Sequence, residues 1–187
     1  RMRLKDISIL LEDLSSLGES IKLELQPTDL AKFMTTLLAS EQASHVAERI
    51  RINCDIAADV PLVPLDRRRF KQAWLNLFKN AVEAMPSGGT ITVRLYRSNA
   101  DVCLEIADTG TGVPPGIDIF EPFTTTKPHG TGLGLGIVRE IVSAHGGAVS
   151  YQSTPQSGAR FTVSLPSGAV GGDWHRRIGE PRWNTDG

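Results

Sequence analysis

The sequence predicts an α+β fold: a two-layer sandwich in which a mixed or largely antiparallel sheet of about five strands carries about three helices on one face. A further helix precedes this sandwich. The order of the apolar patterns supports the prediction, because helix, strand, helix, strand, strand, long loop, helix, strand and strand follow one another. Helices and strands do not alternate regularly, which disfavours a doubly wound parallel sheet. The length of 187 residues and the apolar fraction of 40% suit one sizeable globular domain with short additions.

Composition disfavours several classes of partner. A net charge of −1 gives no bulk attraction to nucleic acid or to an anionic membrane. No apolar run approaches the roughly 20 residues that cross a bilayer, and no secretory signal is recognised, so we expect a cytoplasmic domain. The first residue is Arg1 rather than methionine, which predicts part of a longer protein. Cys54 and Cys103 lie in apolar strand-like runs and are expected to be buried free thiols rather than a disulfide or a metal pair.

Residues 1 to about 21 are predicted to form a single helix with a heptad-like apolar stripe. The stripe follows a spacing of three, four and three residues and then continues, through Leu4, Ile7, Leu11, Leu14 and Ile21. It is too apolar to remain in water. The helix either packs against the domain that follows or forms one arm of a helical bundle between chains. We favour the bundle, because the stripe belongs to an isolated N-terminal helix.

A second helix is predicted after Pro27, with Thr28 as its cap and Asp29 in its first turn. Its buried face is expected to consist of Leu30, Phe33, Met34, Leu37 and Leu38. Alternating apolar residues then predict a half-buried strand, at Ile50, Ile52, Cys54 and Ile56. Pro61 and Pro64 interrupt the pattern after this strand.

The helix predicted for residues 67–85 carries two stripes. Asp66 is a suitable N-cap, and Pro86 with the glycines after it ends the helix. An apolar stripe faces the core, formed by Phe70, Ala73, Trp74, Leu77, Phe78, Ala81 and Met85. A polar stripe lies beside it at spacings of four, four and three, formed by Gln72, Asn76, Asn80 and Glu83. The polar stripe is either a solvated surface or a row of side-chain oxygens for a ligand or a hydrated Mg²⁺.

The second half of the sequence predicts four strands, a long loop and a helix. Two strands occupy 90–97 and 102–107, a loop rich in Gly, Pro and Thr occupies 108–132, and a helix occupies 133–145. A final hairpin is formed by residues 149–153 and 159–165. The tail after Pro166 lacks periodicity and is expected to be mobile or weakly docked.

Two glycine-containing segments in this half predict a nucleotide site. Asp108–Gly112 (DTGTG) follows a strand, so Asp108 is either an ordinary turn residue or an acceptor for an exocyclic amine such as that of adenine. Gly130–Gly136 (GTGLGLG) opens a helix, where unpaired N–H groups and the helix dipole favour phosphate. The spacing matches neither the phosphate loop GxxxxGK(S/T) nor the dinucleotide fingerprint GxGxxG, and signatures of serine, threonine and tyrosine kinases are absent.

Four segments, in this order and spacing, resemble the sequence boxes of two-component sensor histidine kinases. They are Asn76–Ala81 (NLFKNA), Asp108–Gly112 (DTGTG), Phe120–Phe123 (FEPF) and Gly130–Gly136 (GTGLGLG). The resemblance covers roughly residues 1–166 and implies the Bergerat ATP-binding fold that these kinases share with gyrase-type ATPases. The segment EPFTTTKPHGTGLGL is most similar to the corresponding segment of the nitrogen-regulation-like branch of these kinases, which has a short lid.

The resemblance implies a role for each matching position. Asn80 would coordinate a Mg²⁺ that bridges the ATP phosphates, and Asn76 stands where related ATPases carry a water-activating glutamate. Asp108 would bind the adenine amino group. Asn76, Asn80 and Lys127 are the residues expected to act in catalysis, with Lys127 at the start of the lid. Further contacts to the nucleotide are implied for Glu83, whose role stays open, for Gly110, Gly112, Val113, Gly130, Thr131, Gly132, Leu133, Gly134 and Leu135, and through water for Thr162.

The resemblance also implies a domain organisation. Residues 1–24 would be the end of the dimerisation and phosphoacceptor hairpin with its linker, residues 25–166 the ATP-binding catalytic domain, and residues 167–187 a disordered tail. In these kinases an acidic residue follows the phosphoacceptor histidine. None of the four histidines has that context, since the residues after them are Val46, Gly130, Gly146 and Arg176. The sequence is therefore expected to bind ATP and not to phosphorylate itself on histidine.

The implied reaction transfers the γ-phosphoryl group of ATP to a histidine of the hairpin, for relay to a response-regulator aspartate. The expected partners are the hairpin of the same or a second subunit, a homodimer partner that contacts the N-terminal helix, and a response regulator, without direct contact to nucleic acid. Three alternatives share the fold: an ATPase, a serine kinase of the anti-sigma type, and a nucleotide-binding module without activity. Asn76 disfavours the ATPase, because an amide cannot act as a general base. The heptad-like helix disfavours the serine kinase, and the intact Asn80, Asp108 and glycines disfavour the inactive module.

Overall fold

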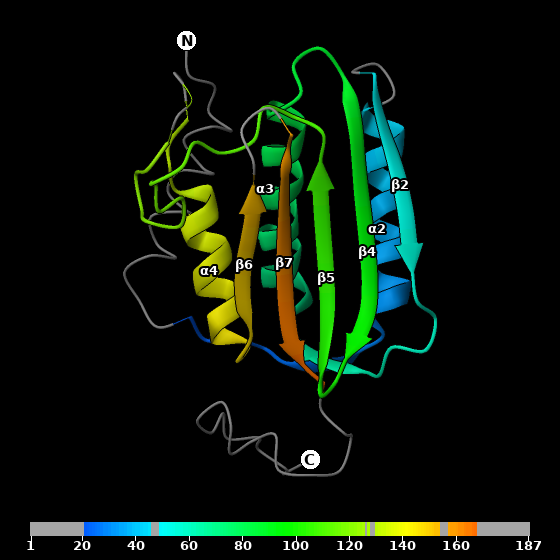
Figure 1. Cartoon of the computed structure of the whole chain (residues 1–187). Coiled ribbons are helices and arrows are strands. Elements are labelled where there is room, and N and C mark those ends of the chain that lie inside the picture. Colours follow the sequence, from blue (N-terminus) through cyan, green and yellow to red (C-terminus); the bar gives the residue numbers. More distant parts are fainter. Residues whose placement is uncertain (1–20, 46–48, 126, 128–129, 154–156, 168–187) are drawn as a thin grey trace, which may run out of the picture.

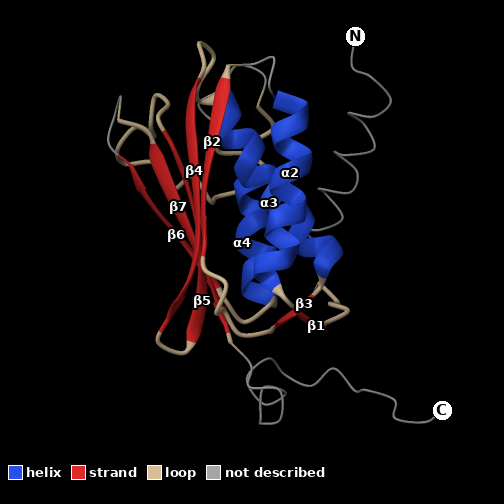
Figure 2. Cartoon of the chain, turned by 90° about the vertical axis from the view of Figure 1, so that its right-hand side faces the viewer, coloured by secondary structure: helices blue, strands red, loops and turns tan. Residues whose placement is uncertain are grey.

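The computed structural model describes residues 21–45, 49–125, 127, 130–153 and 157–167. These residues form two layers, a sheet and a group of helices that covers one of its faces (Figures 1 and 2). The helices are α2 (Leu30–His45), α3 (Arg67–Glu83) and α4 (Gly134–Ala144). The strands of the large sheet are β2 (Ile50–Ile56), β4 (Gly89–Ser98), β5 (Asp101–Asp108), β6 (Ala148–Ser153) and β7 (Ala159–Pro166). The predicted α+β sandwich is therefore confirmed.

The large sheet has the strand order β2-β4-β5-β7-β6, so that β5 lies at its centre. Strand β2 runs parallel to β4, and the other neighbouring strands are antiparallel. The register pairs Ile91 with Asp108 and places Asp108 at the end of β5. From there the chain crosses to the beginning of α4 (Figure 1). The central strand thus ends where the long loop begins.

Alternate residues of the central strands point toward the helices, as a sheet covered on one face requires. On the helix side, α3 buries Trp74 and Phe78, whose ring centroids lie 5.6 Å apart. The core further includes residues of β4, β5, β7 and α4, among them Ile91, Val93, Leu95, Leu104, Ile106, Phe161, Val163, Ile137, Ile141 and Val142. This core holds α3 and α4 side by side on the sheet.

Helix α3 begins where the sequence predicts. Asp66 is its N-cap, and the Oδ1 atom of this residue accepts a hydrogen bond from the N–H of Arg69 at 3.0 Å. The apolar stripe of the helix is buried as predicted, with Phe70, Ala73, Trp74, Leu77, Phe78 and Ala81. The helix ends at Glu83 with Ala84 as C-cap, two residues before the predicted end. Pro86 accounts for this, because a residue before proline disfavours helical backbone angles.

The segment before α2 differs from the prediction. Thr28 does not cap the helix but ends β1 (Gln26–Thr28), which pairs with β3 (Val63–Leu65) in a separate two-stranded antiparallel sheet. Asp29 takes the capping role, since its Oδ1 accepts a hydrogen bond from the N–H of Lys32 at 2.9 Å. Neither β1 nor β3 was predicted, because three-residue strands give no usable period and each contains a proline.

The end of α4 is attached to the beginning of α3. His145, the C-cap of α4, is buried, and its Nε2 accepts a hydrogen bond from the N–H of Asp66 at 3.0 Å. Its Nδ1 lies 2.7 Å from the carbonyl oxygen of Ile141, so the ring is neutral with its proton on Nδ1. The Oδ2 of Asp66 accepts a further hydrogen bond from the N–H of Glu24 at 3.0 Å. Three segments that are distant in sequence therefore meet at this junction.

The two cysteines are free, as expected, but they differ in exposure. Cys103 is buried on β5, whereas Cys54 is exposed on β2 at the edge of the sheet. An edge strand has a neighbour on one side alone, and apolar alternation does not reveal this. The prediction that Cys54 is buried is therefore wrong.

Two expectations fall outside the described residues. The heptad-like helix lies almost entirely within residues 1–20, and the predicted tail, apart from Ser167, lies within residues 168–187. In the described ranges, no helix combines the length and the apolar composition that a membrane span needs.

Candidate functional site

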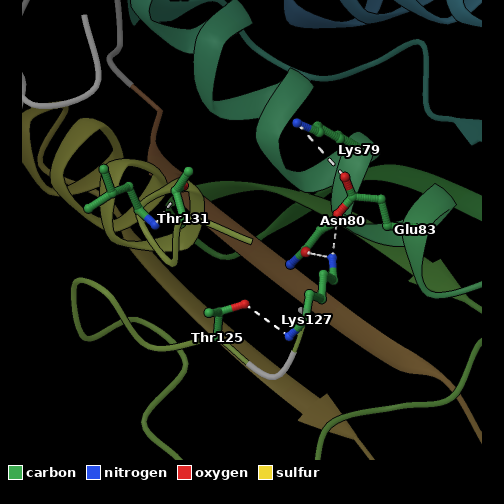
Figure 3. A network of polar contacts seen from close by, with 7 residues as sticks. Lys79, Asn80, Glu83, Thr125, Lys127 and Thr131 are labelled. Atoms are coloured by element: carbon green, nitrogen blue, oxygen red, sulfur yellow. Dashed lines mark hydrogen bonds and ion pairs between the residues drawn. The ribbon is translucent and has the colours of Figure 1, made fainter. Parts of the chain in front are cut away.

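A group of polar side chains connects α3 with the loop before α4 (Figure 3). The Nζ of Lys127 donates hydrogen bonds to Oδ1 of Asn80 at 2.5 Å and to Oε2 of Glu83 at 2.6 Å. Lys79 is a second and more distant cation beside the same carboxylate, at 3.8 Å. The N–H of Lys127 donates to Oγ1 of Thr125 at 3.1 Å. The structure therefore brings together three of the predicted site residues, Asn80, Glu83 and Lys127.

Asn76 lies one turn before Asn80 on the same stripe and faces the beginning of α4. Its side-chain atoms would be the nearest neighbours of a Cβ atom on Gly134, at 3.6 Å. The Nδ2 of Asn76 is buried and has no hydrogen-bond partner within the described part of the chain. An unpaired buried donor costs about 1–3 kcal/mol. Such a donor indicates a position where an acceptor atom of a ligand can be accommodated.

The beginning of α4 has no side-chain cap. Its N-cap residue is Leu133, whose own N–H contacts Oγ1 of Thr131 at 3.4 Å. The first N–H groups of a helix have no partner within it, and those of residues 134–136 lie at the positive end of the helix dipole. Together with the ammonium group of Lys127, these amides form an environment that attracts an anion such as a polyphosphate.

The side chains of Leu133 and Leu135 serve the core instead of a ligand. Leu133 is buried, and Leu135 is half-buried against the core. Any contact of these two residues with a ligand in this arrangement is therefore expected to run through the backbone. The side chain of Thr131 is exposed at the same loop.

Backbone contacts hold the loop before α4. Gly132 has a φ of 68°, and a Cβ atom there would lie 2.7 Å from the Cα of Phe123. The N–H of Phe123 donates to the carbonyl oxygen of Gly132 at 2.9 Å. A Cβ atom on Gly130 would lie 3.2 Å from the Cβ of Lys127. Two chain segments thus approach each other more closely than side chains at Gly132 would allow.

Asp108 ends β5 with a buried side chain on the helix side of the sheet. Its Oδ1 accepts hydrogen bonds from the N–H of Gly110 at 2.8 Å and from the N–H of Ala159 at 3.3 Å. No described residue donates to Oδ2, so this atom is available to a ligand. Burial raises the pKa of the carboxyl above its ordinary value, against the lowering effect of the two N–H groups and of Lys127. The arrangement suits an acceptor for a single amino group.

The residues after Asp108 fix the position of its loop. A Cβ atom on Gly110 would lie 2.7 Å from the Cβ of Ala84, so the loop packs directly on the end of α3. Gly112 has a φ of 72°, in the region that favours glycine. The N–H of Val113 donates to Oγ of Ser153 at 2.7 Å and ties the loop to β6.

Thr162 does not join this group of residues. It pairs with Glu105 on β5 and with Ser150 on β6, and its half-buried side chain alternates with the buried ones of β7. Side chains alternate between faces along a strand, so Thr162 points away from the helices, whereas Asp108 points toward them. The residue of β7 that reaches Asp108 is Ala159. The expectation that Thr162 supports adenine is corrected accordingly.

Sequence reasoning missed Ala159 and Ser153, which both act on the loops of the site. Ala159 contributes its backbone N–H, which leaves no trace in a side-chain pattern. The role of Glu83 was left open, although an acidic residue on the asparagine stripe and a lysine in the facing loop were an available signal. In the described ranges, no three His, Cys, Asp or Glu side chains gather in a way that could hold a metal ion. A cation at Asn80 would therefore depend on oxygens of a ligand or of water.

Comparison with known families agrees with this geometry. Residues 65–169 match the sequence model of the family described as "Histidine kinase-, DNA gyrase B-, and HSP90-like ATPase". The match covers more than half of the chain, which therefore belongs to this family. A curated relative, the C4-dicarboxylate transport sensor protein DctS of Rhodobacter capsulatus, is 36% identical over 149 residues, which are 76% of this chain and 23% of DctS. The chain spans less than half the length of the curated relatives it matches.

Solved structures share the fold. Full-length ShkA in complex with AMPPNP superposes with a TM-score of 0.76 at 29% identity, over 86% of this chain and 35% of ShkA. The catalytic domain of the histidine kinase ThkA gives a TM-score of 0.70 at 28% identity, over 78% of this chain and 97% of that domain. ThkA in complex with the response regulator protein TrrA gives a TM-score of 0.71 at 25% identity, over 88% of this chain and 49% of the ThkA chain. The described part of the chain is thus the ATP-binding catalytic domain of a two-component sensor histidine kinase.

Proposed function

We propose that this domain binds ATP together with Mg²⁺ and transfers the γ-phosphoryl group to a histidine of a helical hairpin, from which an aspartate of a response regulator receives it. One observation carries the proposal: the uncapped beginning of α4 lies beside the asparagine stripe of α3, and the buried carboxylate of Asp108 lies at the end of β5, directly before the loop that packs on the end of α3. An acceptor for a base and an anion site are thus held by one rigid core.

The environment of Asp108 supports adenine over guanine. Its Oδ1 is occupied by two backbone N–H groups, which fixes the carboxylate and leaves Oδ2 as an acceptor. The exocyclic amino group of adenine can donate to Oδ2. Guanine presents a carbonyl oxygen at the equivalent ring position, and two acceptors would then face each other in a buried place.

The stripe of α3 and the beginning of α4 support binding of the phosphates. Backbone N–H groups of residues 134–136, the unpaired Nδ2 of Asn76 and the ammonium group of Lys127 are donors for phosphate oxygens. The Oδ1 of Asn80 is the oxygen that would hold Mg²⁺, an ion that takes few protein ligands and keeps several waters. Bound Mg²⁺ supplies neutralisation of the phosphate charge.

The amide of Asn76 favours transfer over hydrolysis. An amide can orient a phosphate oxygen but cannot remove a proton from water. In the transfer, the lone pair of an imidazole nitrogen forms the new bond to the γ-phosphorus, the bond to the bridging oxygen of ADP breaks, and the imidazolium then loses its proton.

The finer assignments follow the same proposal. Residues 25–166 would form the catalytic domain, since β1 begins at Gln26 and β7 ends at Pro166. Residues 1–24 would belong to the hairpin that joins two copies of the chain. A response regulator is the expected acceptor of the phosphoryl group, and the complex between the similar kinase ThkA and the response regulator protein TrrA supports this. Use of ATP points to a cytoplasmic location, and the segment EPFTTTKPHGTGLGL to the nitrogen-regulation-like branch.

Calorimetric titration with non-hydrolysable analogues of ATP and GTP, each with and without Mg²⁺, tests the proposal. We expect Mg²⁺-dependent binding of the ATP analogue and at least about tenfold weaker binding of the GTP analogue. Equal affinities for the two bases, or no binding at all, would contradict it. Incubation with labelled ATP and a supplied hairpin then separates the activities, because a kinase labels the histidine and an ATPase releases phosphate.

A further inference from the structure

The ammonium group of Lys127 occupies a position between two oxygens of α3. It donates to Oδ1 of Asn80 at 2.5 Å and to Oε2 of Glu83 at 2.6 Å (Figure 3). The backbone presents the side chain in this direction, because the N–H of Lys127 donates to Thr125 and its carbonyl oxygen accepts from the N–H of Gly130 at 3.2 Å. A cation of the protein is therefore held on the oxygen that the proposed function gives to Mg²⁺.

Two cations on one oxygen would repel each other. The Oδ1 of Asn80 accepts a hydrogen bond from the ammonium group, and a divalent ion at bonding distance from the same oxygen would lie within a few ångströms of this positive charge. The like charges repel each other strongly in a half-buried place. Occupation of Asn80 by Lys127 and occupation by a metal ion are therefore mutually exclusive.

Glu83 determines which cation prevails without nucleotide. It forms the short ion pair with Lys127 and a longer one of 3.8 Å with Lys79. Lys79 is largely exposed, with 75% of its side-chain surface accessible, whereas 34% of the Lys127 side chain is accessible. At 2.6 Å the contact with Lys127 is a charge-assisted hydrogen bond, whereas the pair with Lys79 at 3.8 Å is a longer contact of a more exposed side chain, so Lys127 is the principal partner of Glu83.

We infer that Lys127 is a built-in substitute for the metal ion, that Glu83 is the positioning residue that keeps it on Asn80, and that binding of a metal–nucleotide complex must displace it. This inference rests on the proposed function. Displacement removes the two hydrogen bonds from Lys127 to α3 and leaves the ammonium group able to turn to the incoming phosphates. Glu83 thereby makes the attachment of Lys127 to α3 depend on the absence of metal, without contacting the reacting atoms.

Amide hydrogen exchange of the full chain without nucleotide tests the position of Lys127. The variants are Glu83→Gln and Lys127→Met, with Lys79→Met as the matched control that removes the longer ion pair of the same carboxylate. We expect exchange in peptides covering residues 120–136 to accelerate at least threefold in the first two variants and to stay unchanged in the control. Unchanged exchange in Glu83→Gln would overturn the inference. This measurement needs no ligand, so it stands even where the proposed function fails.

Titration with a non-hydrolysable ATP analogue over a series of Mg²⁺ concentrations tests the competition. In Glu83→Gln the carboxylate no longer holds Lys127 on Asn80. We therefore expect that the Mg²⁺ concentration that gives half of the maximal gain in nucleotide affinity is severalfold lower for this variant than for the unmodified chain. A severalfold higher concentration would show that Glu83 is a metal ligand, and an unchanged one that Lys127 does not compete; either result overturns the inference. Absence of nucleotide binding in the unmodified chain would instead contradict the proposed function.

Discussion

At the scale of single residues, the two oxygens of Asp108 have different surroundings. Oδ1 accepts two backbone hydrogen bonds, and no described residue donates to Oδ2. Asp108→Asn would keep an acceptor for the backbone and place an NH₂ group where the adenine amino group is expected. Two donors would then face each other, so we expect affinity for ATP to fall roughly ten- to hundredfold, as for an unsatisfied buried polar group of about 1–3 kcal/mol.

The same substitution should not unfold the domain. The raised pKa of Asp108 means that the folded state favours its neutral form. Its ionisation therefore costs stability as the pH rises through that pKa, and a neutral asparagine removes the cost. Chemical denaturation at pH 7 should show that Asp108→Asn is at least as stable as the unmodified chain. In the calorimetric measurement of ATP affinity, the matched control is Asp55→Asn, which makes the same change at an exposed position. Loss of the folded state, or unchanged ATP affinity, would contradict the assignment.

His145 predicts a pH dependence of stability. Burial lowers its pKa below the ordinary value of 6.5, against the raising effects of the bond to Ile141 and of Asp66. A protonated ring would place an N–H against the N–H of Asp66. The unfolded chain takes up this proton at higher pH than the folded protein does. Stability is therefore complete above about pH 6.5 and is lost as the pH falls below it, by at most about 1.4 kcal/mol per pH unit.

Denaturation at pH 5.5 and at pH 7.5 measures this dependence. In His145→Gln the difference between the two conditions should shrink, because no group at this position titrates. The carboxyl of Asp66 does not confuse the result: burial alone would raise its pKa, but hydrogen bonds from Arg69 and Glu24 hold it below 3.8. An equal difference in the variant would assign the dependence to other groups.

At the scale of elements, two glycines beside α4 should respond differently to alanine. A Cβ atom at Gly132 meets the backbone of Phe123 at a positive φ, which costs on the order of 1–3 kcal/mol. A Cβ atom at Gly134 meets Asn76 at an ordinary 3.6 Å. Gly132→Ala should therefore weaken ATP and ADP binding more than adenosine binding, because it displaces the phosphate side. Gly134→Ala is the matched control for the fold, and equal losses for all three ligands in Gly132→Ala would contradict the prediction.

The elements show which features the sequence could predict. Helix α3 was predictable because a capping aspartate, an apolar stripe and a terminating proline agree within one segment. Strands β1 and β3 were not, because their pairing depends on residues almost 40 positions apart and their own sequences are short. The expectation for Thr162 came from the resemblance; in the structure this residue pairs with Glu105 and lies on the face opposite to Asp108, because side chains alternate along a strand.

At the scale of the whole molecule, a ligand that binds only the folded state should stabilise the domain. At a concentration 100 times its dissociation constant, the gain is about 2.7 kcal/mol. We expect an ATP analogue with Mg²⁺ to raise the midpoint of thermal unfolding and EDTA to reverse most of the shift. Asn80→Ala should lose the part of the shift that depends on Mg²⁺ and keep the rest. A shift independent of Mg²⁺ in the unmodified chain would remove the metal from the proposal.

The architecture as a whole was predictable to the level of two layers. The order of elements indicated a mixed sheet with helices on one face, and the ordered motifs indicated which loops form the site. The spatial order β2-β4-β5-β7-β6 was not accessible, because neighbours in a sheet are chosen by long-range packing. The opposite charges of Lys127 and Glu83 were an available signal, but the contact itself could not be predicted, since it depends on how the loop folds back on α3.

The junction of Glu24, Asp66 and His145 has a mechanical consequence. Helices α3 and α4 run in opposite directions, so the beginning of one and the end of the other share this junction, while their remaining ends hold the asparagine stripe and the glycine loop. Helix α4, with 11 residues, is roughly 16 Å long. A force on the backbone at Glu24 acts on one end of these two stiff helices, and their other ends hold the nucleotide site. A force applied to the chain before Glu24 is therefore transmitted to the nucleotide site through the helices and not through the sheet.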